Sequence, residues 1–337
     1  MLRVLQENGT KTNYPVGVVN WTNEEGARFP KITAASSVWA GKTPQVEAHE
    51  LQEVGSGTAT MKSELERIGY LGQTPCGFKA VPMAAHFELH IEQGPALEAE
   101  GRKIGIVEGV QAYKWFTVTV KGRESHTGTT PFGHRADALL AASRMIVYSQ
   151  RVAHECGALA STGLLDIKPS STNTVPGCVQ FSLDIRAPEQ ETVETVEKAC
   201  KEAFAAIATG GVVAGIEPIK PPSIHHCSVE WRTDVVSEAV KFDGEAIRCI
   251  QESASQCFGP DEVERNTRFM TSGAGHDSLN TSQVVPTGMI FIPCKDGISH
   301  NPAEFSSPED CATGAQVLMN AVLNFDYRRS AVPGRKQ

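Results

Sequence analysis

The segment that indicates the fold is Phe87-Glu88-Leu89-His90-Ile91-Glu92-Gln93-Gly94-Pro95. Apolar and ionisable residues alternate over positions 85–92, which predicts a strand with one apolar face and one polar face. The polar face carries His86, Glu88, His90 and Glu92. That face is therefore either solvated or part of a polar site. Pro95 after Gly94 favours the start of a short helix over 95–101.

An acidic pair, Glu24-Glu25, follows a strand-like run at 16–21. Adjacent residues leaving a strand project to opposite sides. One carboxylate can then bind a metal ion while the other takes a proton from the water that the ion activates. The place also suits a site beyond the carboxyl end of a strand. Taken alone, however, such a pair is more often a solvated loop feature.

Two histidines have equally distinctive surroundings. His90 is followed by Glu92 and Gln93, which could orient an imidazole that binds a metal. His300 lies in a loop between Gly297 and Pro302, and such loops often carry function. For both residues a hydrogen-bonded structural role is the alternative.

Two other segments exclude common enzyme classes. The glycine-rich run 273–277 lacks the Gly-Lys-Ser/Thr ending of a phosphate loop, so nucleotide binding is not expected. Residues 125–130 have no nucleophile-elbow pattern, which makes a serine hydrolase a poor fit.

Composition sets the broad class. The chain has 337 residues, 40% hydrophobic and 21% charged, which suits a globular protein of two domains. A net charge of -8 argues against nucleic acid or an anionic membrane as partner. No apolar run approaches the roughly 20 residues that span a bilayer, and no signal peptide is evident. The nine scattered cysteines suit reduced thiols, so we expect a cytoplasmic α/β protein.

Strand and helix patterns divide the chain into two domains. Alternating residues at 115–120 and 179–186 predict antiparallel strands with one buried face, and helical patterns lie at 134–150 and 191–208. The proline-rich run 218–222 predicts an exit linker. We expect an inserted α+β domain at 111–222 within a larger α/β domain at 1–110 and 223–337. The larger domain is expected to hold helices at 60–69, 243–258 and 308–325 and a strand at 286–293.

The following strings occur in order: Thr22-Asn23-Glu24-Glu25-Gly26, Leu89-His90-Ile91-Glu92-Gln93-Gly94-Pro95, Gly122-Arg123-Glu124-Ser125-His126-Thr127-Gly128-Thr129-Thr130-Pro131, Asn173-Thr174-Val175-Pro176-Gly177, Asp184-Ile185-Arg186 and Ser299-His300-Asn301-Pro302-Ala303-Glu304. Together they resemble the amidase/hydantoinase/carbamoylase branch of the dinuclear zinc exopeptidases. That branch contains N-carbamoyl-L-amino acid hydrolases, fungal-type β-ureidopropionases and allantoate amidohydrolases. The resemblance runs over nearly the whole chain. The histidine at position 90 separates this branch from dipeptidases and aminoacylases, which usually have an acidic ligand there.

The resemblance implies a zinc-exopeptidase-like catalytic domain, a mostly parallel mixed sheet flanked by helices, with an inserted α+β lid or dimerisation domain. It also implies Glu25, His90 and His300 as metal ligands and Glu24 as the general base. In the family two ions, Zn²⁺ or Mn²⁺, are bound per subunit. Water would attack the ureido carbonyl of an N-carbamoyl amino acid or allantoate, releasing ammonia, carbon dioxide and the amino product from a carbamoyl substrate.

Substrate-binding residues are implied in the same way. Asn173 and Arg186 resemble the clamp that holds the substrate carboxylate, with Gln93 nearby, and a guanidinium is a natural bidentate partner for a carboxylate. His126 resembles the histidine that stabilises the oxyanion in the partner subunit's site. A homodimer formed through the inserted domain is therefore expected.

The family's other two ligands, a histidine in H-x-D and a bridging aspartate in G-G-x-[FY]-D-G, have no match in this chain. We therefore expect that an N-terminal part is missing, that residues 1–5 end a helix cut midway, and that the dinuclear centre is incomplete. The chain alone should then bind fewer than two ions and show negligible ureido hydrolysis. Two interpretations stay open: a truncated amidohydrolase, and an inactive paralogue that acts as a dimerising interaction protein.

Overall fold

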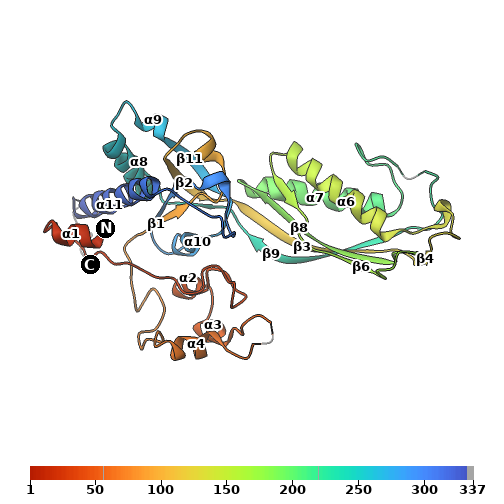
Figure 1. The fold of residues 1–337 in the computed structure, drawn as a ribbon, viewed down its shortest axis with the longest axis horizontal. Helices are drawn as coiled ribbons and strands as arrows, with labels where there is room; N and C mark the ends of the chain where they lie inside the picture. Colours follow the sequence, from red (N-terminus) through yellow and green to blue (C-terminus); the bar gives the residue numbers. More distant parts are fainter. Residues whose placement is uncertain (56, 219, 332–337) are drawn as a thin grey trace. The chain divides into compact units, whose positions relative to one another are not determined.

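The computed structural model describes residues 1–55, 57–218 and 220–331, and the chain divides into two units. The first unit comprises residues 1–110 and 240–337, and the second comprises residues 111–239. Figure 1 shows both units as ribbons coloured along the sequence. The second boundary differs from the expected position at 222, because the strand at 228–237 pairs along its whole length within the second unit. Of the expected linker 218–222, Ile219 lies outside the described residues.

The first unit contains a five-stranded mixed sheet with helices around it. Its strands are β1 (His86–Ile91), β2 (Ile104–Val110), β10 (Val240–Lys241), β11 (Thr267–Ser272) and β12 (Thr287–Ile292). Its α-helices are α1 (Leu2–Glu7), α2 (Ala34–Trp39), α3 (Gln45–Glu50), α4 (Met61–Arg67), α5 (Ala96–Ala99), α8 (Gly244–Phe258), α9 (Val263–Asn266), α10 (Asp277–Thr281) and α11 (Pro308–Ala331). β1 pairs with β12 and β11 with β2 in parallel, whereas β12 and β10 run antiparallel to β2.

The two faces of β1 meet different surroundings, as its alternating sequence predicts. Phe87, Leu89 and Ile91 pack into a core with residues of α8 and α11. The opposite side chains face α10, where Glu88 accepts hydrogen bonds from the Ser278 backbone and hydroxyl. The polar face of β1 is therefore packed against polar groups of α10 rather than fully solvated.

The helices begin where their capping residues predict. Asp243 accepts hydrogen bonds from the backbone of Glu245 and Ala246 at the start of α8. At the start of α11 the Ser307 hydroxyl accepts from the backbone of Asp310 at 3.0 Å. Such caps supply partners to backbone donors that have none within the helix.

Residues 16–21 do not form the expected strand. In the described part of the chain this run has no ladder partner, and Val18 is 73% exposed. A β-branched run has strand propensity, but a strand needs a neighbour for its N–H and C=O groups. The acidic pair therefore follows a segment without regular secondary structure rather than a sheet strand.

The second unit contains a five-stranded sheet covered by two long helices, and a separate two-stranded sheet. The larger sheet consists of β3 (Ala112–Lys121), β5 (Leu159–Ser161), β6 (Leu165–Lys168), β8 (Cys178–Ala187) and β9 (Ser228–Ser237), and the smaller one of β4 (Ser125–His126) and β7 (Thr174–Val175). The two α-helices are α6 (Ala138–Glu155) and α7 (Gln190–Ala208). The two expected strands are confirmed as the antiparallel pair β3 and β8. Phe181, Leu183 and Ile185 are at most 1% exposed and belong to the core beneath α6 and α7. The α/β fold class with mixed sheets is thus confirmed.

Candidate metal centre

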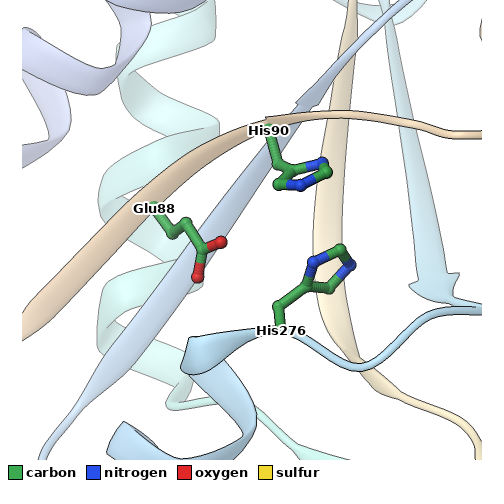
Figure 2. Close-up of side chains that lie close together, drawn as sticks. All are labelled: Glu88, His90 and His276. Carbon is green, nitrogen blue, oxygen red and sulfur yellow. The ribbon is translucent and has the colours of Figure 1, made fainter. Parts of the chain in front are cut away.

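Three possible metal ligands converge on the polar face of β1. Glu88, His90 and His276 each offer a ligand atom, and these atoms all lie within 4.8 Å of one another. Glu88 and His90 come from β1, whereas His276 is the N-cap of α10. Figure 2 shows the carboxylate and the two imidazoles turned toward one another. His276 is only 1% exposed, so this group lies largely away from solvent.

Hydrogen bonds orient both imidazoles. His90 Nδ1 is 2.7 Å from the carbonyl oxygen of Ile91, which can only accept, so Nδ1 carries the proton. The Ser272 hydroxyl donates to the Ala274 carbonyl at 2.9 Å, so it accepts from Nε2 of His276 at 2.9 Å. His90 Nε2 and His276 Nδ1 are thereby left as lone-pair donors. Such outer partners commonly fix the tautomer of a metal-binding histidine.

Buried carboxyl groups surround the same place. Burial, with the charges of Glu25, Asp277 and Glu88, raises the pKa of Glu24 to about 7. Burial likewise raises the pKa of Asp277 to about 6, with a smaller contribution from Glu88. The pKa of His276 is lowered to about 3 by burial and by His90, so this imidazole is neutral at pH 7. Neutral imidazole is the form that binds a metal.

Glu25 and His300 form a separate, exposed pair. His300 Nε2 and Glu25 Oε2 are 3.1 Å apart, and their side chains are 68% and 58% exposed. Gln93 donates to Ser299 at 2.7 Å and lies 3.5 Å from His300 Nε2. Among the described residues, Glu25, His90 and His300 do not form a group of ligands within 4.8 Å of one another. The structure therefore brings two of the expected ligands together and places His90 with other donors.

A close backbone approach places the loop that carries His300. Gly297 has φ +65, and a Cβ there would lie 2.7 Å from the backbone nitrogen of Pro95. Only glycine fits this contact between the loop and the turn at 93–95. Gln93 and His300 themselves have positive φ, at 58 and 54. Backbone strain of this kind tends to persist at functional sites.

The expected substrate-binding residues of the inserted domain lie at two ends of the second unit. His126 and Asn173 belong to adjacent segments, where the Thr127 backbone donates to the Asn173 carbonyl at 3.0 Å. Arg186 lies near the end of β8, paired with Asp184 at 2.8 Å and stacked on Tyr113. The eight steps from position 178 to 186 of β8 span about 26 Å at ~3.3 Å per residue. Within one chain, Asn173 and Arg186 therefore do not form one clamp.

Sequence reasoning did not assign Glu88 or His276 to the site. Glu88 was placed correctly on the polar face, but no role followed from that. His276 lies in the glycine-rich run at 273–277, which was considered only as a phosphate loop. One feature of the sequence could have indicated a site here: His276 and Asp277 stand at the start of α10, shortly after the end of β11. Its partner could not be known before the fold brought α10 onto β1.

Comparisons with known proteins agree with this architecture. Residues 1–324 match the peptidase family M20/M25/M40. The chain belongs to this family, a class of hydrolases. The expected kinship with the hydantoinase/carbamoylase branch is confirmed by a solved hydantoinase/carbamoylase family amidase from Burkholderia multivorans, which is 38% identical with a TM-score of 0.82. The match covers 96% of this chain and 73% of that one.

Two curated relatives specify the kind of hydrolase. An N-carbamoyl-L-amino-acid amidohydrolase from Rhizobium meliloti is 38% identical over 326 residues, covering 96% of this chain and 72% of the relative. An allantoate amidohydrolase from Escherichia coli is 31% identical over 308 residues, covering 90% and 69%. The chain is accordingly a hydrolase of carbon–nitrogen bonds. No helix in the part of the chain that the structure describes is long and apolar enough to cross a membrane.

Proposed function

We propose that this protein is a metal-dependent amidohydrolase that cleaves the ureido C–N bond of an N-carbamoyl amino acid or of allantoate. The observation that carries the proposal is the position of Glu24. This half-buried carboxyl group is close enough to Glu88, His90 and Asp277 for their charges to shift its pKa. A base thus lies beside donors that fit a divalent ion. This combination is what hydrolysis by an activated water requires.

The chain's own residues would act as follows. A divalent ion such as Zn²⁺ or Mn²⁺, when bound at His90, would lower the pKa of a coordinated water. Glu24 accepts a proton from the attacking water and later returns one to the departing nitrogen. Without an ion, burial and the neighbouring carboxylates raise the pKa of Glu24 to about 7, and a carboxyl group with a pKa near the operating pH can both accept and return a proton. By resemblance, Glu25 and His300 would also bind metal.

Substrate contacts are assigned by resemblance and by side-chain chemistry. Arg186 would bind the substrate carboxylate, and its guanidinium is held in place by Asp184 and Tyr113. Gln93 and Asn173 would hold the ureido group, and His126 would stabilise the developing oxyanion. His126 is an exposed side chain, as a residue acting in a homodimer through the second unit would be before assembly.

The test is ammonia release from N-carbamoyl-L-amino acids, N-carbamoyl-β-alanine and allantoate by protein supplied with Zn²⁺ or Mn²⁺. The matched pair is wild type and Glu24→Gln, with the exposed Glu47→Gln as control. Because the sequence predicts an incomplete ligand set, we expect at most weak release, and the release above a protein-free blank should depend on Glu24 and be unchanged in the control. Equal release in wild type and Glu24→Gln would reject the proposal. Substrate binding without any release would favour the inactive, interacting paralogue.

A further inference from the structure

We propose that the indole of Trp115 binds the substrate side chain and makes the protein select N-carbamoyl amino acids with large apolar side chains over allantoate. The contact would form beside Arg186, which is assigned to the substrate carboxylate. This inference rests on the proposed function for the type of substrate and for the role of Arg186. It goes further by naming the substrate class and the residue that selects it.

Trp115 and Arg186 are neighbours on one face of the larger sheet in the second unit. In the antiparallel pair β3 and β8 (Figure 1), Tyr113 lies opposite Arg186, and Trp115 lies opposite Asp184. Side chains directly opposite each other point to the same face, and diagonal neighbours are about 7–8 Å apart. Phe116, the next residue of β3, is 1% exposed and belongs to the core beneath α6 and α7. Trp115 therefore lies diagonally beside Arg186, on the face away from the helices.

Aromatic and ionic contacts position both side chains. The Cζ of Arg186 is 5.0 Å from the centroid of the Tyr113 ring, and its Nη2 is 2.8 Å from the Asp184 carboxylate. The centroids of the Tyr113 and Trp115 rings are 5.6 Å apart. Tyr113 is only 6% exposed, so the ring that contacts both groups is itself held by its surroundings. The guanidinium and the indole are thus preorganised relative to each other, which reduces the cost of ordering them around a ligand.

Trp115 offers apolar surface at one end of a strand face that is otherwise polar. Its side chain belongs to a residue that is 38% exposed. Further along the same face of β3, Thr117 donates to Asp234 at 2.6 Å, and Lys121 pairs with Glu230 at 2.6 Å. These polar groups find partners within the sheet. The open part of the indole, in contrast, is best stabilised by an apolar or aromatic group of a ligand.

The chemistry of the candidate substrates decides which of them suits this arrangement. In an N-carbamoyl α-amino acid, the side chain leaves the carbon atom next to the carboxylate. A carboxylate bound at Arg186 therefore directs the side chain toward the indole one diagonal step away. A phenyl or isobutyl group there would bury apolar area against Trp115. Allantoate has a second, polar ureido group at that carbon atom, so it gains little from the same contact.

The experiment measures equilibrium binding to the full 337-residue chain by calorimetry, without any need for turnover. The ligands are N-carbamoyl-L-phenylalanine, N-carbamoyl-L-leucine, N-carbamoylglycine and allantoate. In wild type, each of the two apolar ligands should bind at least about tenfold more tightly than N-carbamoylglycine, because even one methylene group in an apolar pocket changes binding by about 10–200-fold. Allantoate should bind no more tightly than N-carbamoylglycine.

The variants are Trp115→Ala and the milder Trp115→Phe, which keeps an aromatic ring. Trp115→Ala should reduce the preference for N-carbamoyl-L-phenylalanine over N-carbamoylglycine to about the same affinity for both, and Trp115→Phe should lower it without removing it. Tyr70→Ala is the matched control, because Tyr70 is a 71% exposed aromatic residue of the first unit. It should keep the preference of wild type. The ratio of the two Kd values is the readout, since partial misfolding reduces the amount of competent protein equally for every ligand.

Several results would overturn the proposal: equal affinity of wild type for N-carbamoyl-L-phenylalanine and N-carbamoylglycine, tightest binding of allantoate, no binding of any of these ligands, or an unchanged ratio in both Trp115 variants. An equal loss of preference in Tyr70→Ala would also overturn it. Selective binding without ammonia release would refute the proposed hydrolysis and leave this subsite intact. Ammonia release without selectivity would do the reverse.

Discussion

The carboxylates around Glu88 and the carboxylate of Glu64 belong to the same unit but have opposite electrostatic surroundings. Hydrogen bonds from Arg67 and Arg28 lower the pKa of Glu64 to about 2. Near Glu88, burial and neighbouring carboxylates raise the pKa of Glu24 to about 7 and that of Asp277 to about 6. Glu64 thus has arginine partners, whereas among the described residues Glu24, Glu88 and Asp277 form no ion pair with lysine or arginine. Neighbouring carboxyl groups with strongly raised pKa values mark a candidate functional site.

The largest effect on activity is expected from replacing Glu24, the proposed general base. Glu24→Gln keeps the size of the side chain but removes its ability to accept a proton. In metal-supplied protein, kcat/KM for ureido hydrolysis should fall by about 10²–10⁴-fold, the usual contribution of a general base. Ammonia release measures it. A variant that kept wild-type kcat/KM would assign the base to another residue.

A bound metal ion would give the carboxylates near Glu88 the positive partner that Glu64 has in Arg28 and Arg67, and should therefore stabilise the folded state. Free Zn²⁺ at about a hundred times its Kd should stabilise the folded state by about 2.7 kcal/mol. Denaturant unfolding with and without Zn²⁺ measures this difference. His90→Gln should lose the stabilisation, whereas His154→Gln, at an exposed position of α6 in the second unit, should keep it. The same gain in both variants would show that the ion binds elsewhere.

A smaller effect is expected from the support of Glu88. Ser278→Ala removes the hydroxyl that donates to Glu88 at 2.6 Å but keeps the backbone donor. The Kd for Co²⁺ should rise by about tenfold, since outer-shell partners orient the ligand. Ser282→Ala is the control, because that hydroxyl donates to the Leu279 carbonyl within the same segment. An unchanged Kd in Ser278→Ala would show that Glu88 needs no such support.

The smallest effect is expected at Glu64. Its pKa is lower in the folded state, about 2, than the ordinary value of 4.5. Its contribution to stability is therefore complete above pH 4.5 and is lost as pH falls from 4.5 toward 2. Glu64→Gln should lower the denaturation midpoint at pH 6 and have less effect at pH 3. Glu66→Gln, whose carboxylate is 3.8 Å from Lys62, is the control. An effect of Glu64→Gln that did not change with pH would contradict this account.

Much of the fold followed from local patterns. The alternation of β3 and β8, the periodicity of α7 and the cap of α11 all depend on residues near one another in sequence. The family resemblance followed from short strings in the same way. The strand predicted at 16–21 was wrong for a non-local reason. A strand needs a neighbouring strand to pair with, and the β propensity of a segment does not show whether that neighbour exists.

The site was predicted only in part. The sequence indicated His90 and Glu24 and placed Glu88 on the same face as His90. The family resemblance implied Glu25, His90 and His300 as ligands divided between two ions; in the structure Glu25 lies beside His300, and His90 lies beside His276. These pairings join residues far apart along the chain, so no local pattern contains them.

By itself, the sequence determined the kinds of group available: two carboxylates before Gly26, a polar face on β1, and histidines able to bind a metal. The tertiary structure decided which of them meet. Packing of α10 on β1 joins His276 to Glu88 and His90, and a glycine-dependent approach sets the loop that carries His300. The physical reason is that metal binding depends on ligand atoms a few ångströms apart in space. Those separations arise only when the sheet and helices pack.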